Sequence, residues 1–76
     1  MGKWTPCKRR DFIRKIMNLG FEPPEPGGRH FYMRRGSFTL TLPNNSEYPI
    51  PQVRILVKEI ELGINKKITL GEWEKL

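Results

Sequence analysis

One strictly alternating segment near the middle of the chain constrains the fold more than any other feature. In an extended strand Phe38, Leu40 and Leu42 point to one side, and Thr39 and Thr41 point to the other. A strand with one apolar and one polar face belongs to a sheet that is covered on a single side. The rest of the chain must therefore supply apolar surface that packs against this face.

The first candidate for that cover is an amphipathic helix predicted over residues 6–19. Thr5 is the expected N-cap, Pro6 suits the first helical position, and Gly20 suits the left-handed position after the helix. Basic side chains occupy the opposite face. The apolar stripe that indicates the helix consists of Phe12, Ile13, Ile16 and Met17.

A second helix is predicted over about residues 51–62, with Gly63 expected to end it as Gly20 ends the first. Thr69 and Glu72 have the spacing of a capping box, which predicts a short last helix with Trp73 and Leu76 on its apolar side. The apolar stripe of the second helix is Val53, Leu56, Val57 and Ile60.

Between the helices the sequence predicts a small antiparallel sheet. Residues 22–26 contain three prolines and can form at most a short edge strand, after which two glycines permit a tight reversal. Residues 29–34 form the expected middle strand, joined to residues 38–42 by a short loop at 35–37. The fold class is therefore α+β, with a three-stranded antiparallel sheet packed on helices. The face expected to be open to solvent carries His30, Tyr32, Arg34, Thr39 and Thr41.

The composition predicts one domain, residues 1–76, with a modest core and any active site on an open surface. Fourteen Lys and Arg against eight Asp and Glu give a formal charge of +6, which favours polyanions such as nucleic acid. The alternatives are a solvated basic surface or an acidic protein partner. One cysteine and no apolar run of about 18 residues are typical of a cytoplasmic chain without a membrane span.

The chemistry-bearing residues are few. One histidine and one cysteine give no recognised metal-ligand spacing, and we expect neither a metal nor another cofactor. Cys7, near a helix start and beside Lys8 and Arg9, allows an acidic thiol that pairs with His30 for nucleophilic catalysis. This pairing is the weaker hypothesis, because no third orienting residue is identifiable.

Cleavage of RNA by its own ribose 2′-hydroxyl is the reaction that these residues fit best. It requires a proton-transfer group, for which His30 is the candidate catalytic residue, and cations that stabilise the charge on phosphorus. Tyr32 is a candidate for stacking on an unpaired base or for donating a proton. A single histidine predicts a slow, weakly selective ribonuclease. The residues expected to bind RNA are Lys8, Arg9, Arg29, Tyr32, Arg34 and Arg35.

The order of these features resembles the HicA family, the toxin halves of type II toxin–antitoxin pairs. The similarity spans about residues 8–76 and rests on the series Phe12-Ile13-x-x-Ile16-x-x-Leu19-Gly20-Phe21, on Gly27-Gly28-Arg29-His30, on Leu42-Pro43 and on Ile50-Pro51.

The resemblance implies a double-stranded-RNA-binding-domain-like α-β-β-β-α fold, here with a short extra C-terminal helix. It also implies metal-independent mRNA interferase activity and a HicB-type antitoxin that covers the active face. The family's essential histidine corresponds to His30, and Arg29 stands where many members have serine. A non-catalytic RNA-binding module of the same fold is the main alternative, and a protein-interaction module is a second one.

Overall fold

The computed structural model describes residues 2–76, so Met1 of the expected domain lies outside the described residues. The coarse prediction is confirmed, because the fold is α+β with a three-stranded antiparallel sheet and helices. Within the described range the elements are β1 (Cys7–Lys8), α1 (Arg9–Met17), β2 (Glu25–Gly27), β3 (His30–Arg35), β4 (Phe38–Leu42), β5 (Glu47–Tyr48), α2 (Ile50–Ile64) and α3 (Leu70–Lys75).

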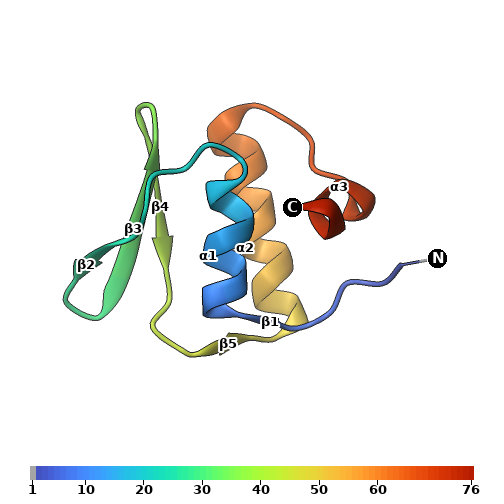
Figure 1. The fold of residues 1–76 in the computed structure, drawn as a ribbon, viewed down its shortest axis with the longest axis horizontal. Helices are drawn as coiled ribbons and strands as arrows, with labels where there is room; N and C mark the ends of the chain where they lie inside the picture. The colour runs from blue at the N-terminus through green and yellow to red at the C-terminus, as the bar shows by residue number, and fades with distance from the viewer. Residues whose placement is uncertain (1) are drawn as a thin grey trace.

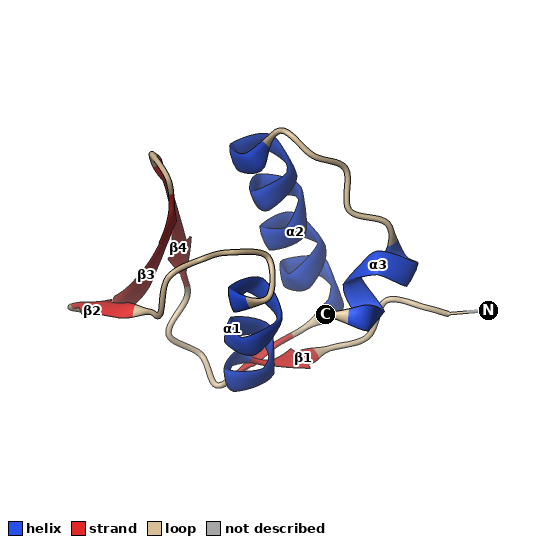
Figure 2. Ribbon diagram, turned by 45° about the horizontal axis from the view of Figure 1, so that its top comes forward, coloured by secondary structure: helices blue, strands red, loops and turns tan. Residues whose placement is uncertain are grey.

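The sheet and the helices form two layers. The sheet has the order β2-β3-β4 and lies on one side of α1 and α2, which run next to each other (Figures 1 and 2). The short helix α3 lies on the far side of these two helices from the sheet (Figure 1). The strands β1 and β5 form a separate two-stranded ladder below the helices. Among residues 2–76, no helix has both the length and the apolar character needed to cross a bilayer.

The start of α1 differs from the prediction. Residues expected in the first helical turn instead form β1, in which Cys7 pairs with Tyr48, and the helix begins at Arg9. The backbone N–H of Arg9 donates to the carbonyl of Ser46 at 2.9 Å, which holds the helix start against the β5 segment. Pairing with a distant strand therefore replaces the N-cap expected at Thr5, since the long-range ladder satisfies the same backbone groups.

Two of the predicted helix ends behave differently. Gly20 has φ +97°, and the N–H of Phe21 donates to the carbonyl of Ile16, so the left-handed end of α1 is confirmed. The helix α2 instead continues through Gly63 to Ile64, and its C-cap Asn65 has φ +55°. Gly63 has a packing role, because a Cβ there would overlap the ring of Phe38.

The predicted capping box, turns and edge strand are present, and the strand boundaries differ from the prediction by a few residues. The capping box of α3 is present, with Thr69 Oγ1 accepting from the N–H of Glu72 at 3.1 Å. Two-residue turns at 28–29 and 36–37 join the strands, each with a glycine at positive φ. The edge strand expected over residues 22–26 is β2, which begins at Glu25 rather than at residue 22. It includes Pro26, which is tolerated because β2 lies at the edge of the sheet.

The core lies between the inner face of the sheet and the two long helices. Met33, Leu40 and Leu42 of the sheet are at most 1% exposed. They form one hydrophobic cluster with the buried stripes of α1 and α2. Tyr48 is fully buried beside them, its ring edge-on to that of Phe12 and its hydroxyl donating to the carbonyl of Pro43 at 2.8 Å.

We predict that Tyr48 makes stability fall at alkaline pH. Burial raises the pKa of Tyr48 from its ordinary value of 10 to about 12, so the folded state favours the neutral phenol. This preference contributes up to about 3 kcal/mol below pH 10, and the contribution is lost as the pH rises towards 12. Urea unfolding of the wild type and Tyr48→Phe across this pH range measures the loss of unfolding free energy.

At neutral pH the Tyr48→Phe variant should be less stable by about 1 kcal/mol, because it lacks the hydrogen bond to Pro43. Its stability should fall less steeply than that of the wild type above pH 10. Parallel pH profiles for the two proteins would contradict the assignment to Tyr48.

Candidate functional site

The outer face of the sheet carries the polar residues that the alternation predicted. In the register of β3 and β4, Tyr32 is opposite Thr41 and Arg34 is opposite Thr39, while Met33 is opposite the buried Leu40. Side chains of opposite residues lie on the same face. The outer face therefore presents His30, Tyr32, Arg34, Thr39 and Thr41, of which all but the half-buried Tyr32 are exposed.

His30 lies at the edge of a groove between this sheet and α2. The groove has a volume of about 620 Å³, with His30 and Thr41 on the sheet side. Ile55 lies on the helix side and is 59% exposed. The remaining lining residues are Pro43, Pro49, Pro51, Gln52, Leu56 and Glu59.

The sequence alone did not identify the α2 side of this groove. Gln52 and Glu59 are more than twenty residues from His30, and only the packing of α2 against the sheet brings them to the same groove. One signal was available, because Ile55 is a large apolar residue outside the apolar stripe of its helix.

Three of the predicted RNA-binding residues lie with His30. Arg29 is exposed in the turn directly before it, and Arg34 is on the same strand face. The Arg34 guanidinium forms an exposed ion pair with Glu25, with Nε 3.5 Å from the carboxylate. The Tyr32 ring lies over Gly27, where any Cβ would overlap it, so the glycine is what allows the ring to lie against the sheet.

The other three residues lie elsewhere. Arg35 is five residues after His30 on the same strand, and residues an odd number apart point to opposite faces of a sheet. Its Nε atom lies close to Gly20. Arg9 is 5.0 Å from the ring centre of Phe31 and donates to the carbonyls of Asn44 and Asn45. Lys8 is exposed on β1, in the separate ladder. The candidate set therefore divides among three regions: the His30 face, the start of α1 and the turn after α1.

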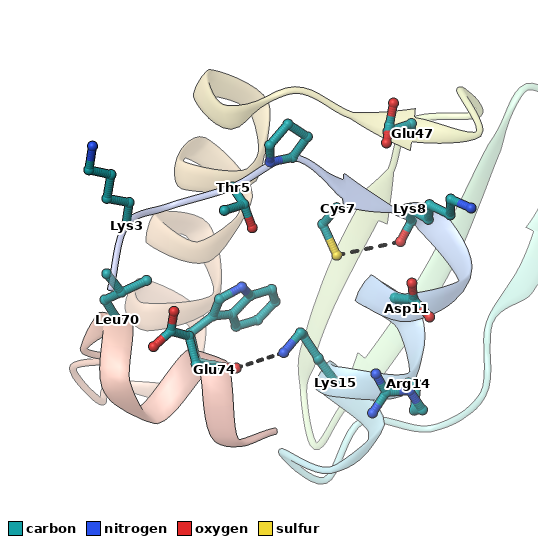
Figure 3. Close-up of a pocket in the computed structure, with 12 residues that line it drawn as sticks. Lys3, Thr5, Cys7, Lys8, Asp11, Arg14, Lys15, Glu47, Leu70 and Glu74 are labelled. Carbon is teal, nitrogen blue, oxygen red and sulfur yellow. Dashed lines mark hydrogen bonds between the residues drawn. The ribbon is translucent and has the colours of Figure 1, made fainter. Parts of the chain in front are cut away.

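A second cleft, of about 420 Å³, lies between the N-terminal segment, α1 and α3 (Figure 3). Cys7 and Lys15 both line it, and the Lys15 ammonium donates to the carbonyl of Trp73 at 2.9 Å and lies 5.3 Å from that ring's centre. The cleft has no residue in common with the His30 groove. Cys7 and His30 therefore do not share a site.

The expectation of an acidic thiol at Cys7 is wrong, because its pKa is raised and not lowered. The residue is 8% exposed, and burial raises the pKa of its thiol. Lys15 acts in the opposite direction, but the loss of hydration is the larger effect. The Sγ atom is 3.5 Å from the carbonyl of Lys8, to which it donates.

Within residues 2–76 no three His, Cys, Asp or Glu side chains gather in an arrangement able to hold a metal ion.

Comparison of the chain with family models, with curated proteins and with solved structures gave no match.

We predict that Cys7 is a slowly reacting thiol. In the folded protein, modification by a disulfide reagent at mildly alkaline pH should be at least about tenfold slower than in concentrated urea, because the thiol is buried and its pKa is raised. A Cys7→Ser variant provides the blank. Equal rates in the folded and unfolded protein would contradict the burial of this side chain.

Proposed function

We propose that this protein is an endoribonuclease of the HicA toxin type, which cleaves mRNA with His30 as its proton-transfer group. The observation that carries the proposal is the position of His30. It is an exposed imidazole on the polar face of a sheet and lines a groove, with Arg29 directly before it in the chain and Arg34 farther along the same strand face. The proposal includes a double-stranded-RNA-binding-domain-like fold, since the sheet is covered by α1 and α2 on one side only.

The proposed reaction needs no nucleophile from the protein. The ribose 2′-oxygen attacks the adjacent phosphorus, a bond forms between them, and the bond from phosphorus to the 5′-oxygen breaks. The 2′-hydroxyl loses its proton, and the departing 5′-oxygen gains one. The products are a 2′,3′-cyclic phosphate and a 5′-hydroxyl. His30 either accepts the first proton or donates the second, which is the role that a positioned imidazole performs in such steps.

The neighbouring residues have complementary roles in the proposal. The guanidinium groups of Arg29 and Arg34 stabilise the negative charge that develops on the phosphate oxygens. The Tyr32 ring, which lies over Gly27, is a platform for an unpaired base. Lys8, Arg9 and Arg35 are less suited to the reaction centre, because they lie away from the His30 face.

The proposal also includes a protein partner. A HicB-type antitoxin would neutralise the toxin by covering the face that carries His30, and an mRNA substrate implies activity in the cytoplasm. The net charge of +6 favours either an RNA or an acidic protein as the partner. A non-catalytic RNA-binding module is the alternative, and the experiments below separate the two.

We predict that His30→Ala abolishes cleavage without abolishing RNA binding. Wild type and variant are incubated with single-stranded RNA in the presence of EDTA, and the product ends are analysed for 2′,3′-cyclic phosphate and 5′-hydroxyl groups. Loss of the proton-transfer group should lower the rate by about two to four orders of magnitude. RNA retention by the variant should change little, since the arginines remain.

Two other results would contradict the nuclease proposal. Equal cleavage by wild type and His30→Ala would mean that His30 does not act in the reaction. RNA binding by both proteins without cleavage by either would favour the non-catalytic module.

We also predict that Glu25→Gln strengthens RNA binding by about twofold to threefold at low salt. The substitution removes the carboxylate that pairs with Arg34 and competes with phosphate for it. Glu74→Gln changes the net charge equally but lies on α3, at the opposite end of the molecule from β2 (Figure 1). Filter binding over a salt series measures both variants. Equal effects would show that net charge, and not the His30 face, controls the affinity.

A further inference from the structure

The groove beside His30 has the character of a small-ligand site rather than of a plain apolar surface. Three prolines, Ile55 and Leu56 form its apolar walls, and four polar residues also line it. Concave sites that bind small planar molecules have this composition, in which the polar groups fix the orientation of the ligand. Apart from His30 and Thr41 on the sheet side, those polar groups are Gln52 and Glu59.

The polar groups of α2 are arranged around one apolar side chain. Gln52 and Glu59 are seven residues apart, which places them on the same helix face about 10 Å apart along the axis. Ile55 lies between them, three residues after the first and four before the second. The two long polar side chains therefore flank Ile55 and can both turn towards one edge of a planar ring that lies on it.

The hydrogen-bonding capacity of these two residues is different and specific. The Gln52 Oε1 atom already accepts from Asn45 Nδ2 at 2.9 Å, so its amide nitrogen is the group left to donate to a ligand. Glu59 is exposed and takes part in neither of the two ion pairs within residues 2–76. Its carboxylate can only accept hydrogen bonds. A matching ligand needs an acceptor for Gln52 and donors for Glu59.

Guanine is the base that matches this pair. Its Watson–Crick edge presents two adjacent donors, N1–H and the N2 amino group, which suit the two oxygens of one carboxylate. The neighbouring O6 atom is an acceptor for the Gln52 amide. Cytosine and adenine each offer one amino group, and uracil offers a single N–H between two acceptors, so none of them satisfies the carboxylate equally well. This edge is free only in an unpaired base.

We propose that the groove between His30 and α2 binds one unpaired guanine of a single-stranded RNA, with Glu59 accepting from N1–H and N2–H and Gln52 donating to O6. The inference rests on the proposed ribonuclease function, because it names the base next to the phosphate that His30 faces. It makes Ile55, Gln52 and Glu59 specificity-determining residues, while His30 and the arginines act on the sugar and the phosphate.

The test uses the full chain and the four nucleoside 5′-monophosphates, which contain no bond that the proposed reaction breaks. Methyl and amide chemical shifts are followed by NMR during each titration. Guanosine monophosphate should bind at least about tenfold more tightly than the other three and should shift the methyl signals of Ile55 and Leu56. Glu59→Gln should weaken guanosine binding by about tenfold or more and remove the preference.

The matched control is Glu74→Gln, which removes the same charge from the lining of the other cleft and should leave guanosine binding unchanged. Because Glu59 is exposed, its substitution should leave the rest of the spectrum intact. Three results would overturn the inference: equal binding of all four nucleotides, an unaltered preference in Glu59→Gln, or shifts confined to Arg29 and Arg34, which would indicate phosphate binding alone.

A dilution series without nucleotide tests a different occupant. Concentration-dependent shifts at Ile55 and Leu56 would assign the groove to an interface between two copies of this chain and would also overturn the inference. Failure of the ribonuclease proposal is separable from these results. If guanosine binds in the groove but RNA is not cleaved, only the nuclease proposal is wrong. If RNA is cleaved without a guanine preference, only the proposed guanine site is wrong.

Discussion

Burial of the inner face of the β3–β4 hairpin determines the arrangement of the rest of the molecule. Met33, Leu40 and Leu42 are almost completely withdrawn from water, and α1 and α2 provide their cover. Because side chains alternate along a strand, burial of this set directs His30 and Arg34 to the opposite face, which is open to solvent. A register shift of one residue would bury the polar set instead. The position of the proposed site is therefore a consequence of core packing.

The basic residues illustrate how packing divides groups of one type between different roles. Arg9 and Lys15 lie over aromatic rings and donate to backbone carbonyls, so much of their hydrogen-bonding capacity is already used in holding α1 to its neighbours. Arg29 is exposed in a turn, and Arg34 pairs with the exposed carboxylate of Glu25. Exposed ion pairs contribute little free energy, so a phosphate can displace such a partner. The net charge therefore does not show which basic residues are free to contact a bound polyanion.

Much of the fold could be predicted because its signals are local. The alternation at Phe38–Leu42, the left-handed Gly20 and the capping box at Thr69 depend on neighbours within a few residues, and each is present in the structure. The errors occur where a distant partner intervenes. The expected N-cap at Thr5 gave way to pairing with β5, and Gly63 continues α2 because it packs under the ring of Phe38.

By itself, the sequence determined the class of the fold, the two faces of the sheet and the position of its single histidine on the polar one, because strand and helix periodicities follow from backbone geometry. The tertiary structure decided the neighbours of that histidine. It brought Ile55 and Glu59 to the same groove as His30, and it buried Cys7 so that its thiol pKa is raised. These relations depend on how α2 and the β1–β5 ladder pack against segments far away in the chain, and no local pattern encodes such distances.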